Sequence, residues 1–286
     1  MMAHGITTEI NGDDRLPLAA RLRYIQANTC RNLRDFARPP FRRFENWRLP
    51  HQARPSNRAA SPGRLLAEAF FVHGLPEHLP PGEISVLEIG CGSGRSRSLL
   101  AEAGYSGRYV GYDIFDRFNR ECDWGFASQF HAADAHTIDA DGSFDLVISN
   151  SALEHIADDA ALVSRLRGCL KPGGIQAHIV PSGSALWAYL WHGYRQYAGG
   201  ALGARFVPEW TSVYGLGGLG SLLYHIVWVT VPELLFRTAL RTRLTGLYAV
   251  CAPAARALDR IAGFGAPMYA VIEQRPTHRK VSTAHS

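Results

Sequence analysis

Three glycines at alternate positions indicate a loop that could bind a reactive ligand. Gly90, Gly92 and Gly94 follow directly on residues 84–89, an apolar and β-rich run typical of a strand buried on both faces. Glycine lets the backbone turn sharply and lets a ligand approach it closely. The next residues, 95–103, can form a helix whose first amides point back at the glycines. The pattern predicts a strand, a loop and a helix that together bind a nucleotide.

The spacing of the glycines bears on which nucleotide is bound. The dinucleotide pattern G-x-G-x-x-G would place its third glycine where this chain has Arg95, whereas the third glycine here is Gly94. An acid, Glu88, also stands two residues before Gly90. The resulting E-x-G-x-G-x-G resembles motif I of the class I S-adenosylmethionine (SAM) methyltransferases. That resemblance implies SAM as the cofactor and S-adenosylhomocysteine as its product.

Two aspartates follow later predicted strands. Asp113 ends the predicted strand 108–113, 23 residues after Gly90. An acid at the end of the second strand of such a unit can accept hydrogen bonds from both ribose hydroxyls. Asp134 follows the predicted short strand 128–132, and Ala133-Asp134-Ala135 resembles the family segment whose Asp side chain and following amide recognise adenine. Taken alone, each aspartate would also fit an ordinary turn at the end of a strand.

The fourth predicted strand, 144–150, begins the longest stretch that resembles a known family motif. F-D-L-V-x-S-x-x-x-L-E-H, which ends at His155, resembles motif IV of the methyltransferase type 11 group. L-K-P-G-G before the predicted strand 175–180 is another mark of that family, and the resemblance covers about residues 84–181. It implies the following cofactor-binding set: Glu88, Gly90, Cys91, Gly92, Gly94, Asp113, Ile114, Asp134, Ala135, Ser149 and Asn150.

The alternation of strands and helices predicts a parallel α/β sheet on its own. Ser61 and Pro62 are typical of the cap and first residue of a helix, which we expect to run to about His73. Asp158 is placed to cap a helix to about residue 170. Residues 268–273 are typical of a late strand, which the resemblance implies to be the closing antiparallel strand of the fold. We therefore expect a Rossmann-like class I methyltransferase fold. It would have a mostly parallel seven-stranded sheet, helices on both faces and a helical insert late in the chain.

Positive charge is concentrated near the N-terminus. Residues 15–64 hold twelve arginines against two acids, so this stretch outweighs the net charge of +5 of the whole chain. We expect an Arg-rich N-terminal arm at 1–60 whose first fourteen residues are flexible, a methyltransferase domain at 61–275 and a flexible tail at 276–286. Arginine and aromatic residues together can bind phosphates or bases. We favour an irregular, solvated arm that packs its aromatic residues on the domain, over contact with an anionic substrate, a membrane or nucleic acid.

The segment at about 182–266 exceeds what a minimal domain of this kind needs, and we expect a helical insert that covers the site. Within it, residues 184–197 are aromatic, with Trp187 and Trp191 one helical turn apart. They predict either a helix that packs on the sheet edge or a wall of the acceptor pocket.

A second part of the insert, residues 210–232, contains no charged side chain. Its glycines disfavour a membrane span. A buried helix or a lid over the acceptor is the favoured interpretation. A helix lying in the membrane surface, with Trp228 and Phe236 beside Arg237, Arg241 and Arg243, is the alternative.

The five cysteines are scattered without a C-x-x-C pair, which argues against a zinc site or a disulfide framework and for a reducing compartment. The first residues lack the apolar core of a secretory signal. We expect a cytoplasmic protein, with peripheral contact at a membrane left open. The sequence presents no convincing set of metal ligands, so we expect no metal.

Methyl transfer from a sulfonium is an in-line displacement, in which the protein mainly positions the acceptor and excludes water. A hydroxyl acceptor would benefit from a general base. His155 is the candidate, because it follows the fourth strand at the carboxyl edge of the sheet, where ligands bind in such folds. A structural or cofactor-side role for His155 is the alternative.

The leading hypothesis is a SAM-dependent methyltransferase that acts on a small-molecule, lipid-linked or glycan-linked acceptor, with oxygen favoured over nitrogen or carbon as the methylated atom. An NAD-dependent oxidoreductase or a sugar-nucleotide enzyme is the second, and Arg95 counts against it. A non-catalytic SAM-fold binding protein is the third. We expect neither nucleic acid nor an obligate protein as a partner.

Overall fold

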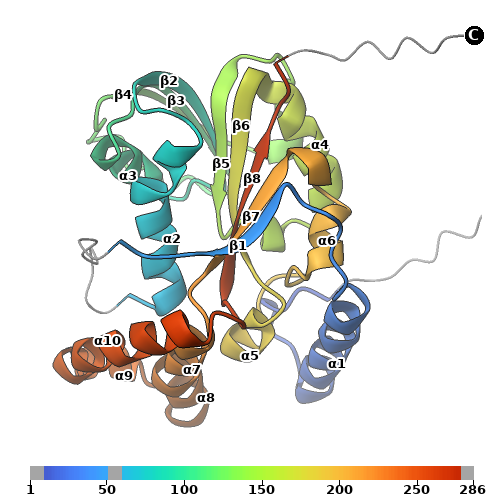
Figure 1. Ribbon diagram of the computed structural model, residues 1–286, viewed down its shortest axis with the longest axis vertical. Helices are drawn as coiled ribbons and strands as arrows, with labels where there is room; N and C mark the ends of the chain where they lie inside the picture. The colour runs from blue at the N-terminus through green and yellow to red at the C-terminus, as the bar shows by residue number, and fades with distance from the viewer. Residues whose placement is uncertain (1–9, 51–59, 278–286) are drawn as a thin grey trace, which may run out of the picture.

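A single sheet of eight strands forms the centre of the computed structural model, which describes residues 10–50 and 60–277 (Figure 1). In spatial order the strands are β1 (Arg43–Trp47), β7 (Thr211–Leu216), β8 (Met268–Gln274), β6 (Leu170–Pro181), β5 (Phe144–Asn150), β2 (Glu83–Ile89), β3 (Ser106–Asp113) and β4 (Phe126–Ala132). Of these strands, β8 alone runs antiparallel to its neighbours. The flexibility predicted for residues 1–9 and 278–286 lies outside the described residues, as do residues 51–59 of the arm.

Helices cover both faces of the sheet. One face packs against α2 (Pro62–His73) and α3 (Ser96–Glu102), through a core cluster that includes Phe70 and Leu100. The other face packs against α4 (Asp159–Cys169) and α6 (Gly199–Gly203), through a second cluster that includes Leu162 and Leu202. A mostly parallel sheet with a core on each face confirms the predicted Rossmann-like fold.

The sheet has one strand more than the predicted seven, because the N-terminal arm contributes β1. This strand pairs in parallel with β7 at the edge of the sheet. Phe44 packs against Tyr269 with ring centroids 5.5 Å apart, and Trp47 packs against Phe70 at 5.4 Å. The two aromatic side chains thus extend the cores on opposite faces.

The expectation of an irregular arm is wrong for two of its segments, since α1 (Leu18–Arg34) precedes β1. Phe44 and Trp47 pack on the domain as predicted, whereas Phe36 is 81% exposed. Where the arm ends and the domain begins stays a prediction.

The late insert is helical except for one strand. Residues 211–216, which open the uncharged stretch, form β7 between β1 and β8, and all six are buried. The helices of the insert are α5 (Ala185–Tyr189), α6, α7 (Leu219–His225), α8 (Val231–Phe236), α9 (Leu240–Arg243) and α10 (Thr245–Ile261). The helix predicted over residues 184–197 is shorter, because Leu190 takes a positive φ of 52° directly after α5.

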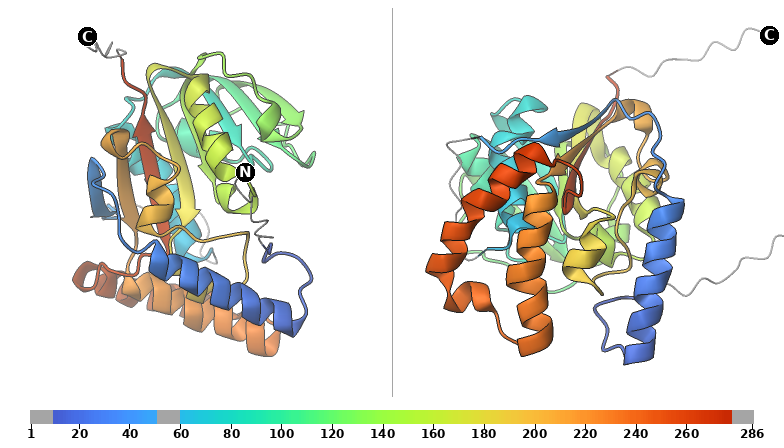
Figure 2. Two further views of the ribbon diagram at one scale, coloured as in Figure 1. Left: turned by 90° about the vertical axis from the view of Figure 1, so that its right-hand side faces the viewer. Right: turned by 60° about the horizontal axis from the view of Figure 1, so that its bottom comes forward.

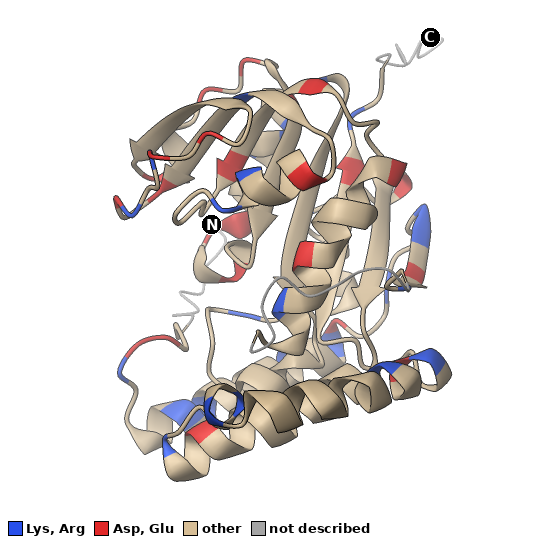
Figure 3. Cartoon of the chain, turned by 90° about the vertical axis from the view of Figure 1, so that its left-hand side faces the viewer, with Lys and Arg blue, Asp and Glu red and all other residues tan. Residues whose placement is uncertain are grey.

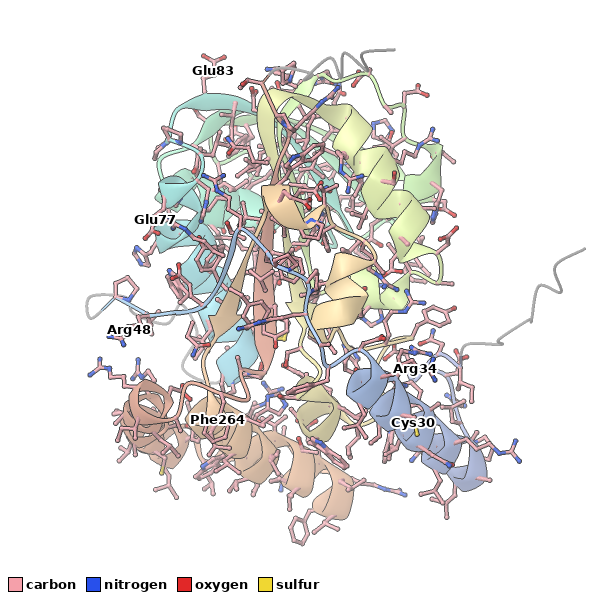
Figure 4. The ribbon with its side chains drawn as sticks, turned by 45° about the vertical axis from the view of Figure 1, so that its right-hand side comes forward. Cys30, Arg34, Arg48, Glu77, Glu83 and Phe264 are labelled. Atoms are coloured by element: carbon pink, nitrogen blue, oxygen red, sulfur yellow. The ribbon has the colours of Figure 1, made fainter. Side chains whose placement is uncertain are left out.

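Helices from both ends of the chain form a layer below the carboxyl ends of the parallel strands (Figure 1, Figure 2). We call α1, α5, α7, α8, α9 and α10 the helical layer. A π-helical turn, Ile226–Thr230, joins α7 and α8 into one helix, Leu219–Phe236. By length and composition alone this helix could cross a membrane, yet 39% of it is buried inside the protein. Figure 4 places Phe264 at the helical layer and Glu83, the first residue of β2, at the opposite end of the molecule.

Candidate functional site

The predicted glycine loop joins the carboxyl end of β2 to α3. Gly90, Gly92 and Gly94 have positive φ angles of 65°, 52° and 73°, which residues with side chains rarely adopt. The amide of Gly90 donates a hydrogen bond to the carbonyl of Tyr112 at 2.8 Å and so fastens the loop to β3. A Cβ on Gly90 would lie 2.4 Å from the Cβ of Ala152, whereas a Cβ on Gly92 would meet nothing within 4 Å. Gly90 therefore lets the chain after β5 come close, and Gly92 borders free space.

Asp113 ends β3 and braces the glycine loop. Its Oδ2 accepts a hydrogen bond from the amide of Gly92 at 2.9 Å, and its Oδ1 accepts one from the amide of Phe115 at 2.9 Å. Each carboxylate oxygen can accept a second hydrogen bond. Asp113 therefore keeps the capacity to accept from the ribose hydroxyls that the sequence assigns to it.

A cavity of about 820 Å³, the first cavity, opens at this edge of the sheet. Its walls include Gly90, Asp113, Ile114, Asp134, Ala135 and His155. Asp134 accepts a hydrogen bond from the amide of His136 at 2.9 Å, and this bond lowers the pKa of its carboxyl. The first cavity thus brings together the predicted ribose and adenine residues, the start of the glycine loop and the candidate base.

A second cavity, of about 350 Å³, adjoins the first, and Gly90 and Ser151 stand in the walls of both. Its other walls come from the sheet edge, α2 and the insert and include Arg64, Glu68, Glu88, Cys91, Arg95, Asn150, Glu154, Tyr189 and His192. The remaining predicted residues, Gly92, Gly94 and Ser149, line neither cavity.

Two residues of the predicted cofactor-binding set, Glu88 and Ser149, form hydrogen bonds with other residues of the protein. Glu88 is 2% exposed and accepts hydrogen bonds from the hydroxyl of Ser96, at 2.6 Å, and from the hydroxyl of Tyr109. Burial raises the pKa of Glu88 to about 7. The buried hydroxyl of Ser149 lies 2.8 Å from Nδ1 of His178. Glu88 therefore ties the start of α3 to β3, while the Ser149 side chain is engaged within the sheet.

His155 lies beside two residues that sequence reasoning missed, Asp13 and His192. Nδ1 of His155 is 2.7 Å from Oδ2 of Asp13, and Nδ1 of His192 is 3.0 Å from Oδ1 of the same carboxylate. Burial alone would raise the pKa of Asp13, but hydrogen bonds with His155 and His192 hold it well below its usual value. Burial alone would lower the pKa of His155, and Asp13 instead raises it. The arrangement favours a charged carboxylate that orients both imidazole rings.

Backbone contacts hold Asp13 in this place. The amide of Gly12 donates to the carbonyl of Gly193 at 2.7 Å, and the amide of Gly193 donates to Asp13 at 3.1 Å. The hydroxyl of Tyr24 on α1 donates to the carbonyl of His192 at 2.7 Å. The predicted flexibility of the first fourteen residues is therefore wrong for this described part, and no local pattern in the sequence could have paired Asp13 with a residue 179 positions later.

Residues 87–177 match the family model described as a methyltransferase domain. This segment is a class I methyltransferase domain. The prediction of a SAM-dependent domain of this class, with SAM as its methyl donor, is thereby confirmed.

The curated relatives match this chain over part of their own length. An uncharacterized methyltransferase of Mycobacterium tuberculosis is 34% identical over 122 residues, which are 40% of this chain and 59% of that protein. The 2-methyl-6-phytyl-1,4-hydroquinone methyltransferase of Synechocystis is 35% identical over 115 residues, 37% of this chain and 36% of that protein. An uncharacterized protein of a Streptomyces fradiae transposon is 36% identical over 100 residues, 33% of this chain and 29% of that protein. The chain thus spans between about a third and three-fifths of these curated relatives.

Solved structures align over more of the chain. The [4+2]-cyclase SpnF covers 91% of this chain and 96% of its own, at 15% identity and a TM-score of 0.48. A putative sarcosine dimethylglycine methyltransferase from Galdieria sulphuraria covers 74% of this chain and 86% of its own, at 13% identity and a TM-score of 0.49.

The aromatic wall expected beside the methyltransferase domain is made by other residues than predicted. Trp191 and Trp228 line neither cavity. The Arg21 guanidinium lies 4.6 Å from the ring centroid of Trp191, and Trp228 packs against Tyr248 at 5.7 Å. From the same segment, Tyr189 and His192 line the second cavity instead.

Asp113→Ala is expected to weaken binding of S-adenosylhomocysteine to the methyltransferase domain by about 1.5–3 kcal/mol, since charge-assisted hydrogen bonds to the ribose would be lost. Calorimetric titration would show this as a dissociation constant raised about 10- to 150-fold. Asp123→Ala is the matched control, because Asp123 also accepts from an amide two residues on, that of Gly125, but lines neither cavity. Unchanged affinity of a folded Asp113→Ala protein would contradict the ribose assignment.

Proposed function

We propose that the protein is a SAM-dependent methyltransferase whose acceptor is a small or lipid-linked molecule with an apolar part, met at the surface of a membrane. The observation that carries the proposal is the junction of two cavities at Gly90 and Ser151, on the carboxyl edge of the parallel sheet. Ligands of open α/β sheets bind outside that edge. We assign the first cavity to the cofactor and the second to the acceptor.

The cofactor assignment gives partners to the two aspartates that end or follow strands at the first cavity, Asp113 and Asp134. Asp113 would accept from the ribose hydroxyls, Asp134 and the amide of Ala135 would bind the adenine edge, and Gly92 would leave room for the cofactor at the loop. When bound, SAM supplies a methyl group activated by a sulfonium. The protein's task is then to align the acceptor and to exclude water.

His155 supports oxygen as the methylated atom. A hydroxyl acceptor gives up its proton as its oxygen takes the methyl group, so a group that acts on this proton speeds the transfer. His155 lines the cofactor cavity, next to the residues that border the acceptor cavity, and Asp13 fixes its ring. We therefore assign to His155 the activation of the hydroxyl.

A third cavity, of about 130 Å³, supports an acceptor with an apolar part. It lies between α2, α7 and α10 and shares Glu68 and Leu99 with the second cavity. Its walls are largely apolar and include Leu49, Leu65, Leu66, Ala69, Val72, Tyr224, Tyr248 and Ala252. A hydrocarbon chain could extend into it while the polar end of the same molecule stays beside Gly90.

The outer surface of the helical layer supports delivery from a membrane. Several of its large apolar side chains are more than half exposed: Val227, Leu235, Phe236, Leu247, Val250, Ile261 and Phe264. Arg237 and Arg243 are exposed among them, and Figure 3 shows the layer as mostly uncharged with basic positions on it. Apolar side chains beside arginine suit a helix that lies in the surface of an anionic bilayer.

The protein is expected to co-sediment with anionic liposomes at low salt. Arg237→Ala combined with Arg243→Ala should reduce the bound fraction severalfold, since each arginine near an anionic surface contributes about 1 kcal/mol. Phe236→Asp should reduce it further, because a charge would enter the apolar surface. Arg108→Ala combined with Arg120→Ala removes the same charge from exposed positions outside the helical layer and serves as the control. Wild-type protein that stays in the supernatant would contradict the membrane contact.

Two measurements test the function itself. Calorimetry should show micromolar or tighter binding of S-adenosylhomocysteine and no binding of NAD, whereas NAD binding would favour the oxidoreductase. Incubation with methyl-labelled SAM and a total lipid extract should then transfer label to the organic phase. A protein that binds the cofactor but labels neither lipid nor water-soluble metabolites would support the non-catalytic alternative.

A further inference from the structure

Four side chains with metal-binding atoms meet between the first and the second cavity. Asp13, His155 and His192 each offer one such atom, and these atoms lie within 4.8 Å of one another. The fourth is Glu154, which is 1% exposed. Neither of its carboxylate oxygens has a hydrogen-bond partner among the residues that the structure describes. Oε1 of Glu154 lies 4.0 Å from Nε2 of His155 and 4.0 Å from Nε2 of His192.

The contacts of Asp13 fix which ring nitrogens carry protons. Its carboxylate lies at hydrogen-bond distance from Nδ1 of both histidines and can only accept, so each Nδ1 must donate. In a neutral imidazole the other nitrogen, Nε2, then presents a lone pair. Both Nε2 atoms lie 4.0 Å from the same buried carboxylate oxygen, Oε1 of Glu154, which leaves a gap between the three atoms. A buried charge of this kind is costly unless something pairs with it.

We propose that this gap binds a divalent transition-metal cation, with Nε2 of His155, Nε2 of His192 and a carboxylate oxygen of Glu154 as its protein ligands. Zinc, for example, binds imidazole nitrogen at about 2.0–2.1 Å and carboxylate oxygen at about 2.0–2.2 Å. Around a tetrahedral ion, ligand atoms at these lengths stand about 3.4 Å from one another. Oε1 of Glu154 and each Nε2 are 4.0 Å apart, so the three groups can close on an ion by side-chain shifts of about 0.6 Å.

Asp13 completes the site from outside. Histidines that bind a metal usually donate their other ring N–H to a carboxylate, which fixes the tautomer and the orientation of the ring. Asp13 does this for both rings at once. Two histidines and one carboxylate are a donor set suited to zinc and to iron(II), and three protein ligands leave coordination positions open.

The alternative to a bound cation is that both histidines are protonated. Each imidazolium ring would then direct an Nε2–H at Glu154. A separation of 4.0 Å is too long for such a hydrogen bond, so this state would leave the buried carboxylate without a close donor. A cation bound by all three groups accounts for the unpartnered oxygens and for the orientation of both rings.

The place of the site gives the cation a role, and this role rests on the proposed function. His155 and Asp13 line the cofactor cavity, while Glu154 and His192 line the acceptor cavity. A cation with open positions on the acceptor side would bind the acceptor oxygen and lower the pKa of its hydroxyl. With Nε2 bound to the cation and Nδ1 donating to Asp13, His155 would hold the cation and would not take the proton itself. The acidified hydroxyl would release its proton to solvent water as its oxygen takes the methyl group.

Cobalt(II) is the probe for the site, because its visible absorption reports the ligands directly. Protein without a histidine tag should bind one equivalent with a micromolar or lower dissociation constant, and Zn²⁺ should displace it. Glu154→Gln and His192→Ala should each raise the dissociation constant by at least about 100-fold, and Asp13→Asn by about 10- to 100-fold because it acts from outside. His131→Ala, at an exposed histidine on β4, should leave it unchanged.

Three results would overturn the proposal: no cobalt absorption with folded wild-type protein, equal affinity in Glu154→Gln, or a thiolate charge-transfer band, which would place the ion on the exposed Cys30 or Cys122. If His192→Ala does not fold by circular dichroism, His192→Gln takes its place. S-adenosylhomocysteine binding, measured on the same metal-free protein, separates a failure of this proposal from a failure of the proposed function.

Discussion

Gly92→Val is expected to abolish binding of S-adenosylhomocysteine in a protein that still folds. The φ of Gly92 is +52°, and a β-branched residue is strained there. A Cβ at this position meets no protein atom within 4 Å, so the valine methyl groups would project into open space beside the loop. The Gly92 amide donates to Asp113, which lines the cavity that we assign to the cofactor, so the change acts directly beside that cavity. Calorimetry should show affinity lower by at least about 100-fold, equivalent to nearly 3 kcal/mol.

Gly125→Val is the control for strain alone. Gly125 also has a positive φ, of 82°, and a Cβ there would meet nothing closer than 3.7 Å, but it lies in the turn before β4 and lines neither cavity. This variant should lose stability and keep its affinity. Native affinity in a folded Gly92→Val protein would mean that the glycine loop does not hold the cofactor.

Asp159→Ala is expected to lower the free energy of unfolding by about 3–5 kcal/mol, because it leaves buried cations without their counter-charge. Asp159 is 1% exposed. Its carboxylate lies 2.5 Å from Nη1 of Arg195 and 2.6 Å from Nε of Arg205, and it accepts a hydrogen bond from Tyr197 at 2.6 Å. These contacts join α4 to the first part of the insert, so chemical denaturation should detect their loss.

Asp158→Ala, one residue earlier, is the matched control. Asp158 caps α4 by accepting from the amide of Ala161 at 3.3 Å, and its loss should cost about 0.5–2 kcal/mol. A similar loss in the two variants would show that the buried network adds nothing to an ordinary cap. If Asp159→Ala does not fold, Asp159→Asn tests the same charge with the shape kept.

The strands around the glycine loop could be predicted because their signals are local. The predicted bounds of β5 agree with the structure, and β2 begins one residue earlier than predicted, at Glu83. In both segments an unbroken apolar run ends at turn residues or glycine, so a few neighbouring residues determine the strand. β6 is longer than predicted: it begins at Leu170 and includes the whole Leu-Lys-Pro-Gly-Gly segment that we expect to precede it.

β1 and β7 could not be predicted because they depend on residues far away in the sequence. Arg43–Trp47 has the composition of a charged arm and becomes a strand by pairing with β7. Thr211–Leu216 is buried on both faces, so it lacks the alternation of polar and apolar residues that marks a half-exposed strand. The same holds for the site, where the fold brings Asp13 to His155 and His192.

β1 also sets the order in which the protein can be completed. Arg43 pairs with Ser212, 169 residues later in the chain. During synthesis the N-terminal arm leaves the ribosome first, yet it has no strand to pair with until β7 has been made. Contacts between such distant residues form slowly, because a long loop must close first. Asp13 precedes β1, and its partners His155, His192 and Gly193 lie more than 140 residues later, so a nascent chain carries an open site at least until residue 193 has been made.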